Sequence, residues 1–222
     1  MSEARADILG RVRRAQRSKL QQHEILEALT ELGVAPPAPR DAEDILESFK
    51  LRLKLNHASL EACATRAEAV QLISHYVYQR CRTRKVVTGY DPRLAAMPWR
   101  DGGVLVRFDA ATAEDPLSIS YAKLAIAESG SLILFSNRSN PAANNWLVQD
   151  HIILLDQQDL VADFEQAWEK IREHQIETGS PRGISFISGP SSTADIKGHL
   201  VFGAHGPQRL HIIFIGPEAL PP

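Results

Sequence analysis

A run of small and hydroxyl-bearing residues at positions 189–195 could bind a ligand directly. The run follows an apolar stretch that we expect to be a strand. A strand that enters a glycine turn and then begins a helix presents backbone N–H groups and hydroxyls, and the helix dipole adds to their attraction for an anion. We therefore predict a site for a small anionic ligand in this loop, formed by Gly189, Pro190, Ser191, Ser192, Thr193 and Asp195.

The same loop allows a purely structural interpretation. Ser192 as N-cap, with Asp195 three residues later, has the spacing of a capping box. Capping would explain Ser192 and Asp195, but it explains Gly189, Pro190 and Ser191 less well. Both interpretations stay open at this point, and both predict that a short helix begins near Ser192.

His205 is a second candidate, in the segment Gly203-Ala204-His205-Gly206-Pro207. A histidine flanked by glycines and followed by proline is held in a constrained turn. The pKa of imidazole lies near physiological pH, so His205 could transfer a proton or orient a ligand. We predict His205 as a catalytic residue and Gly206 as a ligand contact. The alternative is an ordinary histidine in a turn.

Glu128 is a third candidate, because it lies beside a tight turn between two expected strands. Its carboxylate could point into a cleft as the acidic neighbour of His205, with Gly130 contacting the ligand, or it could be a solvated loop residue. His151, Asp195 and His205 are residue types that bind metals. No short ligand spacing joins them, so we predict no metal site.

The elements that must position these residues alternate between amphipathic helices and short apolar strands. Strands are predicted at 59–63, 86–88, 104–108, 125–127, 132–135, 152–155, 184–187 and 211–215. This alternation favours an α/β fold with a mainly parallel sheet and helices on its faces. Ligands bind beyond the carboxyl ends of strands in such sheets. We expect the loop after Ile187 to lie at one of those ends.

A proline-rich segment at 35–40 interrupts the chain. Its sequence, Ala-Pro-Pro-Ala-Pro-Arg, is typical of a stiff, extended linker. Helical spacing precedes it, and a further helix is predicted from Asp41 to about Lys54. We therefore predict an N-terminal helical extension over residues 1–55 and an α/β domain over residues 56–222.

Composition argues against several classes of protein. A formal net charge of −2 provides no basic field for nucleic acid. No stretch approaches the roughly 18 apolar residues of a membrane span, and the first residues lack the pattern of a signal peptide. The two cysteines, Cys63 and Cys81, form no C-x-x-C, so no standard spacing for an iron–sulfur cluster is present. These features favour a cytoplasmic protein without a nucleic-acid partner or a membrane span.

Common catalytic and nucleotide-binding motifs are also missing from the sequence. It contains no G-x-G-x-x-G, Walker A, H-E-x-x-H or G-x-S-x-G pattern. A conventional dinucleotide-binding enzyme, nucleoside triphosphatase, zinc protease or serine hydrolase therefore has no support.

Several segments together resemble the LUD-domain family, and within it the lactate-utilization C type. The specific match is at the C-terminus, where GPSSTADI at 189–196 is followed by LVFGAHGP at 200–207 and an apolar strand from His211. The turn Ala127-Glu128-Ser129-Gly130 resembles the family's Ala-Glu-Thr-Gly turn, with Ser in place of Thr. A weaker match covers residues 5–13.

The resemblance implies a Rossmann-like sheet similar to the sugar-phosphate isomerase and CoA-transferase group, with an N-terminal helical extension. It implies a subunit or accessory of an L-lactate dehydrogenase complex that forms pyruvate. Two iron–sulfur lactate-utilization proteins would be its partners and would hold the clusters, with no cofactor in this chain. Two alternatives stay open: a stand-alone enzyme acting on a phosphorylated or CoA-linked metabolite, and an assembly scaffold that binds no small molecule at residues 189–195.

Overall fold

The computed structural model describes residues 3–15, 22–31, 45–194 and 200–216. The chain divides into two units, Met1–Pro39 and Arg40–Pro222. Helices α1 (Glu3–Ala15) and α2 (Gln22–Glu31) belong to the smaller unit. Helix α3 (Ile45–Leu55) belongs to the larger one, where its Phe49 and Leu53 are buried. The sequence had instead placed this helix in the extension of residues 1–55.

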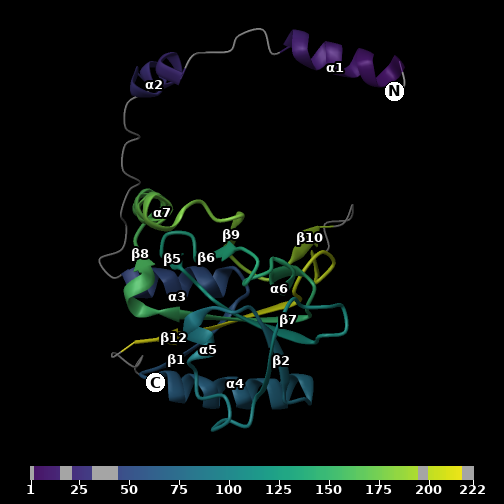
Figure 1. The fold of residues 1–222 in the computed structure, drawn as a ribbon. Helices are drawn as coiled ribbons and strands as arrows, with labels where there is room; N and C mark the ends of the chain where they lie inside the picture. Colours follow the sequence, from purple (N-terminus) through teal and green to yellow (C-terminus); the bar gives the residue numbers. More distant parts are fainter. Residues whose placement is uncertain (1–2, 16–21, 32–44, 195–199, 217–222) are drawn as a thin grey trace. The chain divides into compact units, whose positions relative to one another are not determined.

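A six-stranded parallel sheet forms the centre of the larger unit, in the order β1-β12-β7-β4-β2-β3 (Figure 1). Strands β7 and β12 are almost continuously apolar because both faces of the sheet are covered. The predicted α/β class is confirmed. The strands are β1 (Ser59–Cys63), β2 (Lys85–Thr88), β3 (Leu105–Phe108), β4 (Leu117–Tyr121), β7 (Asp150–Asp156) and β12 (Arg209–Ile215).

A second, four-stranded sheet lies above the first, in the order β8-β5-β6-β9. Strands β5 and β6 form the predicted hairpin. Strand β9 pairs antiparallel with β6, so it does not extend the parallel sheet, as the sequence reading had assumed. The strands are β5 (Leu124–Ile126), β6 (Ser131–Ser136), β8 (Leu160–Val161) and β9 (Gly183–Ile187).

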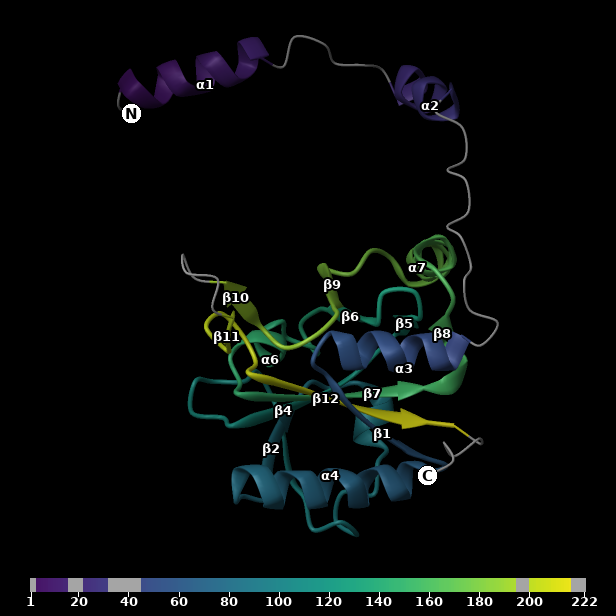
Figure 2. The same cartoon turned by 180° about the vertical axis from the view of Figure 1, so that it is seen from behind.

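The helices and sheets of the larger unit form layers, which Figures 1 and 2 show from opposite sides. Helix α4 (Arg66–Cys81), capped by Thr65, covers one face of the central sheet. Helix α3 and the second sheet cover the other face. Helix α7 (Phe164–Thr178) covers the outer face of the second sheet. The short helices are α5 (Pro92–Ala95), α6 (Ala143–Trp146) and a 3-10 turn (Gln157–Asp159).

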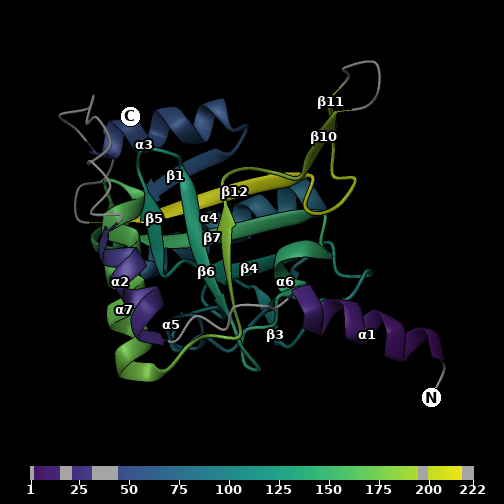
Figure 3. The same ribbon diagram turned by 90° about the horizontal axis from the view of Figure 1, so that it is seen from above.

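Residues 192–194 form a strand, so the prediction of a helix beginning near Ser192 is wrong. Strand β10 (Ser192–Ala194) pairs antiparallel with β11 (Leu200–Phe202) in a hairpin that projects from the rest of this unit (Figure 3). The capping-box interpretation is wrong for the same reason, because Ser192 caps no helix. Asp195 lies outside the described residues. No helix in the described ranges is long and apolar enough to cross a membrane.

Candidate functional site

Ser191 joins the two C-terminal motifs that the sequence singled out. Its backbone N–H donates to the carbonyl of Pro207 at 2.8 Å, and its carbonyl accepts from Gly203 at 2.8 Å. The backbone N–H of His205 donates to the Ser191 hydroxyl at 3.3 Å. Gly206 lies so close that a Cβ there would be 3.2 Å from the Cβ of Ser191. The structure therefore brings Ser191, His205 and Gly206 together.

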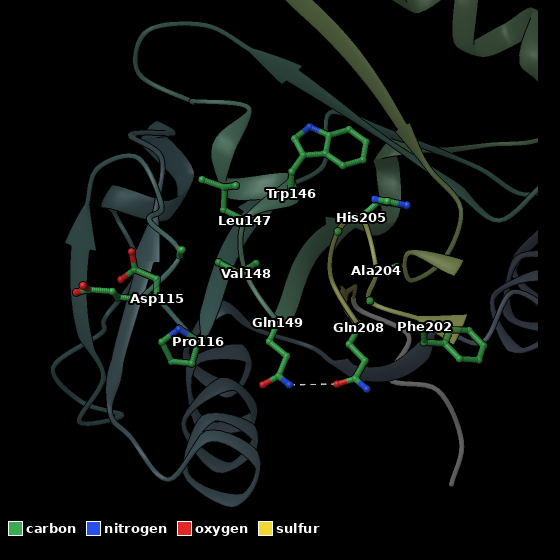
Figure 4. Close-up of a pocket in the computed structure, with 14 residues that line it drawn as sticks. Asp115, Pro116, Trp146, Leu147, Val148, Gln149, Phe202, Ala204, His205 and Gln208 are labelled. Carbon is green, nitrogen blue, oxygen red and sulfur yellow. Dashed lines mark hydrogen bonds between the residues drawn. The ribbon is translucent and has the colours of Figure 1, made fainter. Parts of the chain in front are cut away.

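These residues border a cavity of about 780 Å³, which we call the amino-edge cavity (Figure 4). Its walls come from residues 113–116, 146–149 and 202–208, the segments that lead into β4, β7 and β12. The cavity therefore lies at the amino ends of the parallel strands. The sequence had placed the loop after Ile187 at the carboxyl ends. That prediction is wrong because β9 belongs to the second sheet and runs antiparallel to β6.

Polar and apolar groups share the lining of the amino-edge cavity. Trp146 and His205 are exposed along its wall, and the Gln149 amide donates to the Gln208 amide oxygen at 3.1 Å (Figure 4). Glu114 and Asp115 contribute carboxylates. Because its described lining has no Lys or Arg, this cavity does not by itself favour an anion.

Asp115 is held by hydrogen bonds rather than free to react. Its carboxylate accepts from the Arg107 guanidinium and from the backbone and hydroxyl of Thr112. Burial alone would raise the pKa of Asp115, but these hydrogen bonds outweigh it and lower the pKa. Asp115 is therefore an ionised, structural carboxylate at neutral pH.

Gly189 and Gly130 serve close packing against the end of α3. A Cβ at Gly189 would collide with the backbone oxygen of Asn56. Gly130 has a φ of +70°, and a Cβ there would be 2.9 Å from the Cβ of Arg52. The Asn56 amide donates to the carbonyl of Ser129 at 2.9 Å. Both glycines thus let a turn close over the last turn of α3.

Hydroxyl groups connect those two turns. The Ser129 hydroxyl donates to the Ser131 hydroxyl at 2.8 Å, and the hydroxyls of Ser131 and Ser188 are 2.7 Å apart. Farther along, Pro190 is half-buried, and Ser192 and Thr193 are exposed on β10. The predicted loop therefore has a half-buried, structural beginning and an exposed end.

Glu128 lies away from the amino-edge cavity. Its carboxylate Oε1 accepts from the backbone N–H of Phe164 at 3.0 Å, at the first residue of α7. The N-cap Asp163 accepts from Gln166 at 2.9 Å in the same turn. Glu128 is absent from the cavity lining, so the structure does not bring it together with His205 as the sequence had suggested. Its position instead stabilises the start of α7.

Two further histidines are core residues. His151 Nε2 is 2.8 Å from the Ser120 hydroxyl, and burial lowers its pKa to about 3. His211 Nδ1 is 2.8 Å from the Ser59 hydroxyl, and its ring stacks on Tyr76. Burial also lowers the pKa of His211, to about 4. In the described ranges, no three His, Cys, Asp or Glu side chains come together where they could hold a metal ion.

Sequence reasoning missed most of the cavity lining, above all Trp146, Leu147, Gln149 and Gln208. The available signal was the segment Asn144-Asn145-Trp146-Leu147, where large apolar side chains follow a polar pair just before an apolar strand. Such a pattern does not separate exposed apolar residues from core residues, because strand pairing decides which of them stay uncovered.

Comparisons with known proteins agree with these motifs. Residues 107–215 match the LUD domain family. A "Lactate utilization protein C" of Exiguobacterium is 26% identical over 184 residues, which is 78% of each chain. Another of that name, from Geobacillus thermodenitrificans, is 36% identical over 101 residues, or 45% of this chain and 42% of that protein. An uncharacterized protein of Neisseria meningitidis is 39% identical, but the match spans only 43% of its length.

The fold has a counterpart among solved structures. A DUF162 family protein from Deinococcus radiodurans superposes with a TM-score of 0.58 at 20% identity, over 81% of this chain and 100% of that one. This likeness concerns the fold alone. Together, these comparisons show that residues 107–215 form a LUD domain and that the chain is similar to proteins named Lactate utilization protein C.

Proposed function

We propose that this chain acts in lactate utilization as a cytoplasmic subunit of an L-lactate-oxidising complex whose iron–sulfur clusters lie in two partner proteins. Its similarity to proteins named Lactate utilization protein C supports the lactate role. Oxidation of lactate to pyruvate needs a group that takes the hydroxyl proton and a redox centre that takes the electrons. In this proposal the partners supply the redox centre.

The observation that carries the proposal is the exposure of apolar side chains in the lining of the amino-edge cavity and on β11, the strand that leads into that lining. Trp146 and Leu147 are each 51% exposed, and Leu200 and Val201 of β11 are 50% and 48% exposed. We call these four residues the amino-edge surface. Single exposed apolar residues are common, but a group that includes an aromatic ring marks a protein interface. Its proposed occupant is an iron–sulfur partner.

The chemistry of the cysteines supports placing the clusters in the partners. A thiol must lose its proton to bind iron. Cys63 is buried with its sulfur 3.8 Å from the carbonyl of Phe214, and Cys81 is 3.9 Å from the Asp150 carboxylate. Burial raises the pKa of each thiol to about 11. Both thiols therefore stay protonated at neutral pH.

His205 is the proposed proton-transfer or ligand-orienting group of the amino-edge cavity. Its backbone is fixed by Ser191, and its exposed ring lies on the same side of the cavity as Trp146 (Figure 4). A neutral imidazole in this position could accept a proton from a substrate that a partner holds at the interface. Glu128 has no part in this proposal, because it stabilises α7.

Affinity purification of the tagged chain from its native cell tests the assembly. We expect iron–sulfur proteins to co-purify with the wild type and to be lost from the double variant Trp146→Ala, Leu200→Ser. Ile176→Ser is the matched control, because Ile176 is an apolar residue of α7 that is 85% exposed and lies outside the amino-edge surface. A wild-type chain that purifies without iron would contradict the proposal.

A further inference from the structure

The boundary between β2 and β4 is the place where the chain reverses direction across the central sheet. From β2 the chain continues outward to β3, whereas from β4 it continues the other way, to β7 and then β12. The β2–β3 connection places Leu94 and Trp99 on the α4 face. The β4–β7 connection places Leu132 and Leu134 on the opposite face. Such a switch point opens a crevice beyond the carboxyl ends of the two strands, where open α/β sheets bind ligands.

A cavity of about 360 Å³ lies at this switch point, and we call it the carboxyl-edge crevice. One wall comes from residues 90–92, which follow β2, and from Lys123, which follows β4. The other wall comes from the loop after β6 and from the end of α7 with the segment that follows it, through Arg182. The volume falls within the range of small-molecule sites.

The lining of the carboxyl-edge crevice is rich in positive charge. Lys123 is half-buried and Arg182 is exposed, and both belong to the lining. Asp91 is the one carboxylate among the described lining residues. Asp91 caps α5 by accepting from the Arg93 N–H at 2.8 Å, and it pairs at 3.3 Å with the Arg93 guanidinium, which Asp159 also contacts at 3.3 Å. The crevice therefore attracts an anion, unlike the amino-edge cavity.

His174 contributes a ring that neighbouring residues hold in place. The Thr178 hydroxyl donates to the His174 carbonyl at 2.9 Å, and its oxygen lies 3.0 Å from the His174 ring Nε2. The ring packs against Phe135 at 5.1 Å between centroids. The His174 ring thereby adds a polar group to the lining of the crevice.

We propose that the carboxyl-edge crevice binds a small oxyanion, a carboxylate or a phosphate group, through Lys123 and Arg182 with His174 beside them. The inference stands on this geometry and does not depend on assembly with partners. It moves the anion site from residues 189–195, where the sequence had suggested it, to the opposite edge of the central sheet.

Isothermal titration calorimetry of the purified full chain tests the site with L-lactate, pyruvate and inorganic phosphate in separate titrations. We expect saturable binding of at least one probe. Lys123→Met, which keeps most of the apolar stem, and Arg182→Ala, at an exposed position, should each weaken it about tenfold or more, because each removes a charged hydrogen-bond donor. Lys85→Ala is the matched control, an exposed cation at the amino end of β2.

The results of the three titrations distinguish a carboxylate ligand from a phosphate ligand. Binding of L-lactate or pyruvate supports the site and identifies its anion as a carboxylate, held apart from His205 at the other edge of the sheet, whereas binding of phosphate alone supports the site and favours a stand-alone enzyme on a phosphorylated metabolite. The inference is overturned if no probe binds, or if binding survives in both variants. It is also overturned if His205→Gln abolishes binding and Lys123→Met does not. The iron co-purification experiment can fail without affecting this result.

Discussion

Ser191 takes part in three hydrogen bonds that join its own loop to the segment 203–207. Its hydroxyl contributes only one of them, the bond from the His205 N–H. Ser191→Ala should therefore lower the free energy of unfolding by about 1 kcal/mol, measured by urea denaturation. Ser192→Ala, at an exposed position on β10, is the control and should change it by less than about 0.5 kcal/mol. Equal losses in the two variants would contradict the role assigned to Ser191.

Glu128 is predicted to matter for stability rather than for proton transfer. Glu128→Ala removes the acceptor for the first N–H of α7 and should cost about 1 kcal/mol of unfolding free energy. Glu128→Gln keeps an oxygen acceptor and should cost less. Urea denaturation of the two variants measures the difference. A fully stable Glu128→Ala protein that has lost activity in the assembled complex would show that Glu128 is a catalytic residue after all.

His205 is predicted to matter for lactate oxidation rather than for stability. Its side chain is exposed, so His205→Gln should change the free energy of unfolding by less than about 0.5 kcal/mol. The same substitution should lower L-lactate oxidation by the assembled complex about a hundredfold, the lower end of the contribution of a general base. Thermal unfolding and steady-state rates on one preparation measure both effects. Unchanged rates would remove His205 from the mechanism.

At the scale of single residues, the sequence identified His205, Gly206 and Ser191, and the structure brings these three together. Their glycine and proline neighbours restrict the backbone, which is a local property that a sequence can indicate. The Glu128 contact could not be predicted in this way. Its partner, Phe164, lies 36 residues away and becomes a neighbour only when β8 pairs with β5.

At the scale of elements, two buried histidines on neighbouring strands make stability depend on pH. His151 on β7 and His211 on β12 have pKa values lowered to about 3 and about 4, against 6.5 for an ordinary histidine. Above pH 6.5 both are neutral in folded and unfolded chains, so their contribution is fully present. As pH falls below 6.5, the unfolded chain binds protons that the folded chain does not, and stability is lost toward pH 4.

Urea midpoints at several pH values between 7.5 and 4 measure this effect. We expect the midpoint to fall steadily below about pH 6.5. His211→Gln, which keeps a polar side chain beside Ser59, should reduce the fall, whereas His205→Gln at the exposed site should leave it unchanged. A midpoint that rises on acidification would contradict the assignment of both histidines as neutral core residues.

The positions of several strands could be predicted from the sequence, but their pairing could not. Apolar runs located β1, β7, β9 and β12 within a few residues, because alternation and hydrophobicity are local. Residues 192–194 were misread, because Ser and Thr suit a helix cap as well as an exposed strand, and pairing with β11 decides between them. The sequence also could not predict which sheet β9 joins, because tertiary packing determines its pairing with β6.

At the scale of the whole larger unit, the central sheet separates two surfaces with different chemistry. Its amino edge presents apolar side chains and His205, whereas its carboxyl edge presents Lys123, His174 and Arg182. The layered α/β class could be predicted from the order of helices and strands in the sequence. The chemical contrast between the two edges could not be predicted, because it depends on which loops the parallel strands bring together. We propose that the amino edge contacts a partner protein and that the carboxyl edge binds a small anion.

Reconstitution of lactate oxidation from purified proteins tests whether this chain is a subunit of the complex. The rate of L-lactate-dependent reduction of an artificial electron acceptor would be measured for the two iron–sulfur partners, with and without this chain. We expect the full rate to require all three proteins, and we expect the Trp146→Ala, Leu200→Ser variant not to restore it. Full activity of the partners alone, or of this chain alone, would contradict the claim that it is a subunit of the oxidising complex.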